Sequence, residues 1–98
     1  MSLKDSYDFQ NLVNETERLV MEQLEVQLQE DFAKDICKCQ DCVLDMAAYA
    51  LNSLKPVYRV SLIGTLYAHN LDTTEYGEEV KKAVRSAIDK VAANPSHD

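Results

Sequence analysis

With 98 residues, the chain can form one domain with a small core, so residues 1–98 are expected to fold as a single unit. The formal charge of −7 argues against nucleic acid as a partner, because affinity for a duplex comes mainly from neutralising phosphates. The apolar runs are far shorter than the roughly 20 residues that a bilayer span needs, and the first residues lack the apolar core of a signal peptide, so we expect a cytoplasmic protein without membrane association.

The scarcity of turn residues, with two glycines and two prolines, favours a few long helices over many strands. We therefore expect a mostly α-helical domain of three to four helices. The first predicted helix covers residues 6–30, with Ser6 or Asp8 as its N-cap. Its broad apolar stripe contains Leu12, Val13, Leu19, Val20, Leu24, Val26 and Leu28. Such a stripe either packs on the chain's other helices or forms, in part, the seam of a homodimer.

All three cysteines lie within the six residues 37–42, at Cys37, Cys39 and Cys42. A cytoplasmic disulfide framework is not expected, because the number is odd and residues two apart bridge poorly. Thiolates suit zinc, which they bind in a tetrahedron at about 2.3 Å, and a helix N-terminus helps to stabilise them. The sequence therefore predicts a zinc site; the alternative is a group of reduced, partly buried cysteines at the start of a helix.

The fourth zinc ligand stays open on the sequence. His69 is the best single candidate by chemistry, Asp35 and Asp41 are close in sequence, and a water or a partner chain could also serve. A water ligand would permit catalysis in principle, but no acid–base pair accompanies the cluster. We therefore expect a closed, structural site and no enzymatic activity.

A second predicted helix follows the cysteines over residues 43–54 and is expected to be the central, most buried one. Asp41 is its expected N-cap, and Pro56 ends it, since the residue before a proline avoids helical geometry. Residues 57–67 are rich in β-branched and aromatic residues and predict an extended segment or short strand. That strand would either pair across a two-fold axis or be a connecting loop.

The last predicted helix begins at a capping box over residues 72–75, formed by Asp72 and Glu75. A turn at residues 69–72 precedes it. Apolar residues then recur at helical spacing to about Ala93, and Pro95 closes the helix.

The segment after the second helix offers a candidate nucleotide site. Lys55, Tyr58 and Arg59 combine cations that can bind phosphate with an aromatic face for stacking. A further basic face on the last helix would contain Lys81, Lys82 and Arg85. The alternative is that these are surface charges that pair with the many carboxylates.

The order Cys37-x-Cys39-x-x-Cys42, followed by Val43-Leu44-Asp45-x-Ala47-x-x-Ala50-Leu51-Asn52-x-x-Lys55-Pro56-x-Tyr58, resembles the core of the late competence development protein ComFB family. The resemblance implies a small, largely helical homodimer whose cysteine-bearing members bind zinc through this cluster. Some members without the cysteines bind cyclic dinucleotides as second-messenger receptors. We therefore expect a non-enzymatic zinc-binding signalling module, in its sharpest form a receptor for cyclic di-GMP or cyclic di-AMP. The alternative is a structural, zinc-stabilised dimeric adaptor whose only partner is another protein.

Overall fold

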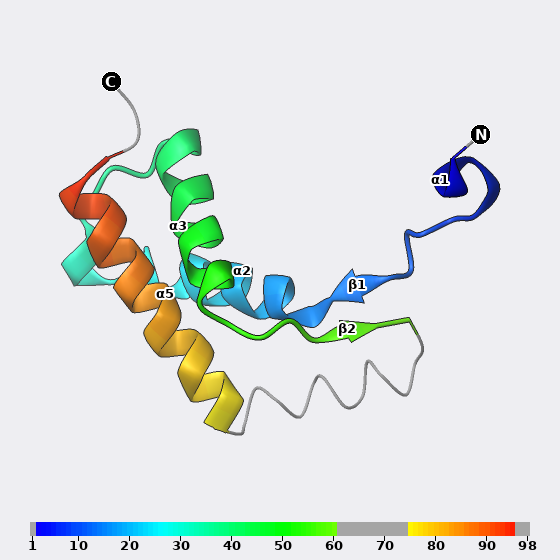
Figure 1. Ribbon diagram of the computed structural model, residues 1–98. Helices are drawn as coiled ribbons and strands as arrows, with labels where there is room; N and C mark the ends of the chain where they lie inside the picture. Colours follow the sequence, from blue (N-terminus) through cyan, green and yellow to red (C-terminus); the bar gives the residue numbers. More distant parts are fainter. Residues whose placement is uncertain (1, 61–74, 96–98) are drawn as a thin grey trace.

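The computed structural model describes residues 2–60 and 75–95 and is mostly helical, as the sequence predicts. Among these residues it contains four α-helices, a short 3-10 helix and a two-stranded sheet. In chain order these are α1 (Leu3–Ser6), β1 (Val13–Asn14), α2 (Glu15–Gln27), η1 (Asp31–Ala33), α3 (Gln40–Asn52), β2 (Tyr58–Arg59) and α5 (Glu75–Ala93). Figure 1 shows α2, α3 and α5 gathered in one body, whereas α1 lies apart from it.

The hydrophobic core lies where α2, α3 and α5 meet. Each helix contributes residues at spacings of three and four, which place them on one face. The buried members are Leu19, Val20 and Leu24 of α2, Cys42, Met46 and Ala50 of α3, and Val80, Val84, Ala87, Ile88 and Val91 of α5. The contribution of α5 is larger than that of α3, so the expectation that the second helix would be the most buried is wrong. The reason is that α5 packs against both other helices along its 19 residues.

The predicted first helix over residues 6–30 is too long at its start, because α2 begins only at Glu15. Asn14 is the N-cap instead of Ser6 or Asp8, and its side chain accepts a hydrogen bond from the backbone N–H of Thr16 (3.2 Å). The Asp8 side chain accepts from the N–H of Gln10 (2.8 Å), a local turn that competes with helix. The apolar periodicity in the sequence therefore includes Leu12 and Val13, which precede the helix.

The strand predicted within residues 57–67 is present at Tyr58–Arg59 and pairs inside the chain. It runs antiparallel to β1, with Val13 opposite Arg59 and Asn14 opposite Tyr58. The connection is reinforced because the Asn14 side chain also accepts from the N–H of Val57 (2.7 Å). The backbone N–H and C=O groups of β2 therefore find hydrogen-bond partners without pairing across a two-fold axis. The remainder of the prediction, over residues 61–67, lies outside the described residues.

The second predicted helix is confirmed with shifted ends, at residues 40–52 instead of 43–54. Its N-cap is Cys39 instead of Asp41, because the Cys39 sulfur occupies the capping position and accepts from a backbone N–H of the first turn. The last helix is confirmed from residue 75 to residue 93. The turn at residues 69–72 and Asp72 lie outside the described residues. No helix in residues 2–60 and 75–95 is long and apolar enough to cross a membrane.

Candidate functional site

The three cysteines converge at the start of α3. Cys39 is the N-cap, Cys42 lies in the first turn, and Cys37 is in the segment before the helix. Their Sγ atoms all lie within 4.8 Å of one another. Sulfurs around a tetrahedral zinc ion would be about 3.8 Å apart, given a zinc–sulfur bond of about 2.3 Å. Small side-chain rotations would therefore suffice for this cluster to hold a metal ion.

The electrostatic setting of the cluster favours thiolates. The Cys39 sulfur accepts a hydrogen bond from the backbone N–H of Cys42, at a distance of 3.4 Å. The positive end of the α3 dipole points at the same place. Cys42 is 1% exposed and belongs to the core, whereas Cys37 and Cys39 are partly exposed and pack against it. A metal ion here would therefore tie the surface segment to the core.

The segment before α3 is held in place by Lys38. Its ammonium group donates hydrogen bonds to the backbone carbonyls of Ala33 and Ile36, the second at 3.2 Å. Both carbonyls belong to the connection between α2 and α3, so Lys38 fixes this connection next to the start of α3. Neither Asp35 nor Asp41 belongs to the group of mutually close ligand atoms found among the described residues. His69, the other fourth ligand proposed from the sequence, lies outside the described residues.

The structure places Arg59 beside a buried carboxylate that the sequence did not single out. The Arg59 Nε donates to Oε1 of Glu15, and Nε of Arg18 donates to Oε2 at 2.6 Å. Arg18 also reaches Glu22 at 2.6 Å. The hydrogen bond from Arg18 lowers the pKa of Glu15 below its ordinary value, burial opposes this shift, and Arg59 adds to the lowering. Nothing in a Glu-rich helix distinguishes this carboxylate, because its second partner, Arg59, is 44 residues away in the sequence.

The other residues of the predicted nucleotide site lie at the surface. Tyr58 is 61% exposed, and Lys55 is exposed as well. The Lys55 backbone is fixed, because its carbonyl accepts hydrogen bonds from Thr16 Oγ1 (2.8 Å) and from the Tyr76 hydroxyl (2.5 Å). An aromatic side chain and a cation therefore stand on a rigid connection between α3 and β2.

The predicted basic face on α5 is largely engaged with other groups. The Arg85 guanidinium lies 3.7 Å from the centre of the Phe32 ring, and its Nε is 3.4 Å from Asp89. Lys81, Lys82 and Arg85 line a hollow of about 290 Å³ together with Gln27, Glu30 and Glu78. The mixed charge of this hollow favours the alternative that these cations partner carboxylates.

An apolar groove of about 700 Å³ lies between α2 and α3. Its apolar lining consists of Met21, Leu24, Leu28, Val43, Leu44 and Ala47, and its polar lining of Arg18, Glu22 and Glu25. Met21 is 64% exposed and Leu44 is 58% exposed, so no side chain within residues 2–60 and 75–95 covers the groove. The breadth of the apolar stripe on the first predicted helix indicated that α2 would leave apolar residues exposed. That α3 forms the other side of the groove could be seen only in the fold.

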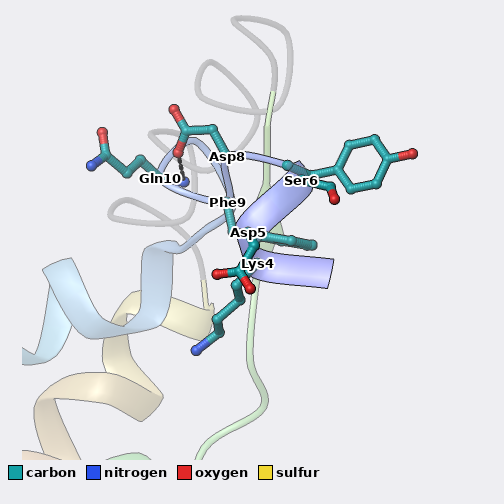
Figure 2. Close-up of a pocket in the computed structure, with 7 residues that line it drawn as sticks. Lys4, Asp5, Ser6, Asp8, Phe9 and Gln10 are labelled. Atoms are coloured by element: carbon teal, nitrogen blue, oxygen red, sulfur yellow. Dashed lines mark hydrogen bonds between the residues drawn. The ribbon is translucent and has the colours of Figure 1, made fainter. Parts of the chain in front are cut away.

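A further hollow, of about 620 Å³, is formed by residues 4–10 at the N-terminal end (Figure 2). All its lining residues are exposed and come from one continuous segment. Figure 2 shows Lys4, Asp8 and Gln10 pointing in different directions instead of converging. This hollow therefore lacks the convergent polar groups that characterise a binding site.

Comparison with known proteins gives one consistent answer. The family model of the late competence development protein ComFB matches residues 13–95, which include the cysteine cluster, the groove and Arg59. Among solved structures, the late competence protein ComFB from Bacillus subtilis is similar, with a TM-score of 0.68 and 25% sequence identity. That match covers 87% of this chain and 92% of the other. No curated protein matches this chain.

Proposed function

This chain belongs to the late competence development protein ComFB family, and on that premise we propose that it is a non-enzymatic, zinc-binding regulatory module that works in the cytoplasm as a homodimer. The observation that carries the proposal is the convergence of Cys37, Cys39 and Cys42 at the start of α3. Thiolate-rich sites are typical of structural zinc, whereas catalytic zinc sites keep a position open for water. With a fourth protein ligand to complete the tetrahedron, the zinc ion would stabilise the fold and take no part in a reaction.

Metal content tests the zinc proposal. We expect elemental analysis of the chain purified without added metal to find about one zinc per chain. Cys39→Ser should lose most of it and lower the melting temperature by several degrees, because metal binding is coupled to folding. Gln40→Ser is the matched control, since Gln40 is exposed in the same turn and its change should leave zinc content unchanged. Wild-type protein without bound metal would contradict the proposal.

A second copy of the chain is the occupant that we propose for the groove between α2 and α3. The support is the large exposed area of Met21 and Leu44, on neighbouring helices, which the described part of the chain leaves uncovered. Two-fold homodimers are the commonest assemblies, and apolar patches of this kind are typical of interfaces. The interface would bring together the α2–α3 faces of the two copies.

A cyclic dinucleotide, cyclic di-GMP or cyclic di-AMP, is the ligand that we propose for the module, at Lys55, Tyr58 and Arg59. The exposed ring of Tyr58 supports this, because it offers a stacking face beside a surface cation on a fixed backbone. Arg59 follows Tyr58 on β2, and its side chain is paired with Glu15 at the start of α2. Base stacking and phosphate contacts would then come from one short segment.

Calorimetry on zinc-loaded protein tests the nucleotide proposal. We expect heat with cyclic di-GMP or cyclic di-AMP, and Tyr58→Ala should weaken binding by roughly tenfold, since stacking of a base contributes about 1–3 kcal/mol. Tyr49→Ala is the matched control, because Tyr49 is 43% exposed on α3 and outside the proposed site. Tyr58 is a cleaner probe than Arg59, whose removal would also disturb Glu15.

If neither dinucleotide gives heat, the zinc-stabilised adaptor remains as the function, with another protein as its partner. The zinc and homodimer proposals do not depend on that outcome.

A further inference from the structure

Cys39 and Cys42 form a Cys-x-x-Cys pair across the first turn of α3. We propose that this pair is a peroxide-sensitive dithiol, whose oxidation to a disulfide dismantles the metal site. The inference rests on the zinc site proposed above and concerns its regulation: the module would be loaded under reducing conditions and emptied by hydrogen peroxide.

The geometry of the pair suits a disulfide. An N-cap residue and the third residue of a helix lie on the same side of the first turn, as residues three apart do throughout a helix. The two sulfurs are within 4.8 Å of each other, and an S–S bond is about 2.05 Å long. The N–H of Cys42 already points at the Cys39 sulfur. Rotation of the side chains can therefore close the bond while α3 stays in place.

The two thiols differ in their exposure to solvent, which determines which of them reacts first with peroxide. Cys39 is partly exposed and forms the N-cap of α3, with its sulfur beside the backbone N–H of Cys42. Cys42 is 1% exposed and lies in the core beside it. Peroxide from the solvent therefore reaches Cys39, and Cys42 is protected until it acts as the resolving thiol.

Cys37 is less suited to either role. It lies only two residues from Cys39, a spacing that bridges poorly, and it belongs to the segment before α3 instead of the first turn. The pairing of Cys39 with Cys42 thus leaves Cys37 as the remaining thiol of the cluster.

The reaction proceeds in two displacements. The Cys39 thiolate attacks one oxygen of hydrogen peroxide, the O–O bond breaks, and hydroxide leaves, which gives a sulfenic acid at Cys39. The Cys42 thiolate then attacks the Cys39 sulfur, the S–O bond breaks, and a second hydroxide leaves as the disulfide forms. Two thiolates lose two electrons to the peroxide, and the two hydroxides take up protons to become two waters.

Formation of the disulfide would release the zinc ion, because the metal site loses ligands. Oxidation removes two of the three converging thiolates, and one thiolate is too few to hold a zinc ion tightly. Metal release and disulfide formation are therefore expected to occur together and to reverse when a thiol reductant and zinc are supplied.

The test uses the zinc-loaded chain titrated with hydrogen peroxide. Zinc release is followed with a chromogenic chelator, and disulfide formation by intact mass and peptide mapping. We expect a mass loss of two hydrogen atoms, a crosslink between Cys39 and Cys42, release of the zinc in the same proportion, and reversal by dithiothreitol. Cys37→Ser should form the same crosslink. Cys42→Ser should form no crosslink between these positions and should instead leave a Cys39 sulfenic acid that dimedone traps.

The outcomes separate this inference from the zinc proposal. Zinc that is bound at the outset and retained, with unchanged mass, would overturn the inference and leave the zinc site standing. A chain that contains no zinc but forms the crosslink between Cys39 and Cys42 would overturn the zinc proposal and the coupling, because nothing would be released. A crosslink to Cys37, or oxidation to sulfinic acid without any crosslink, would overturn the assignment of the pair.

Discussion

Glu15 is a carboxylate buried in the described part of the molecule, with 1% of its surface exposed. Burial alone would disfavour its charge, but the guanidinium groups of Arg18 and Arg59 supply hydrogen bonds and opposite charge. Its position in the first turn of α2 also places it at the positive end of the helix. One side chain thereby connects the start of α2 to β2.

We expect Glu15→Gln to destabilise the fold by about 2 kcal/mol, because a buried, charged hydrogen-bond acceptor between two partly exposed arginines is lost. Urea unfolding at neutral pH measures the effect. Glu17→Gln is the matched control, since Glu17 is exposed in the same turn and should change stability by less than about 0.5 kcal/mol. Equal effects of the two changes would show that the network contributes nothing.

The pH dependence of this effect has a definite sign. The pKa of Glu15 is lower in the folded chain than its ordinary value of 4.5, so its stabilisation is present in full above that value. It is lost as the pH falls through the folded-state pKa. The difference in unfolding free energy between wild type and Glu15→Gln should therefore shrink on acidification below about pH 4.5. A difference that is constant from pH 7 to acid would contradict this account.

At the scale of the elements, the helices are joined at the Lys55 carbonyl. Thr16 of α2 and Tyr76 of α5 both donate hydrogen bonds to this oxygen, and their own hydroxyl oxygens are 2.6 Å apart. Lys55 follows the end of α3, so its carbonyl connects the first turns of α2 and α5 to the C-terminal end of α3. This junction is at the opposite end of α3 from the cysteine cluster.

Removal of one hydroxyl tests this junction. Tyr76→Phe should lower the free energy of unfolding by about 1 kcal/mol, because the ring keeps its packing while its hydrogen bond to the Lys55 carbonyl is lost. Denaturant unfolding measures it. Tyr49→Phe, on the exposed face of α3, should have almost no effect. The same loss in both variants would assign the effect to something other than the junction.

At the scale of the whole molecule, the body of α2, α3 and α5 buries one core and leaves one apolar groove open. The groove runs along the faces of α2 and α3 that α5 does not cover. A chain of this length gains stability from assembly, because its own core is small. The proposed dimer would therefore be part of the stability of the fold.

Sedimentation equilibrium tests the dimer. We expect wild type to have twice the mass of the chain, and Met21→Glu or Leu44→Glu to shift it to the monomer, because each places a charge in the groove. Val26→Glu is the matched control: Val26 is 55% exposed on α2 but does not line the groove. A monomeric wild type, or an equal effect of Val26→Glu, would contradict the assignment.

Features that depend on neighbouring residues along the chain could be predicted before the fold was known. The mostly helical class and the extent of α5 follow from residues that recur at helical spacing. The cysteine cluster follows from three ligands within six residues at the start of a helix, so its convergence could be predicted before any fold was known. The same motif carried the resemblance to the ComFB family, which the family model confirms.

Other features became apparent only from the fold: the start of α2, the partner of β2, the burial of Glu15 and the open groove. Each depends on contacts between residues far apart in the chain: Asn14 caps α2 while it also binds the N–H of Val57, 43 residues later. Apolar residues recur at helical spacing before the first residue of α2. Their spacing indicates which residues are apolar, but not which backbone groups form hydrogen bonds. The long-range hydrogen bonds of Asn14 and Glu15 therefore set a boundary that local pattern could not.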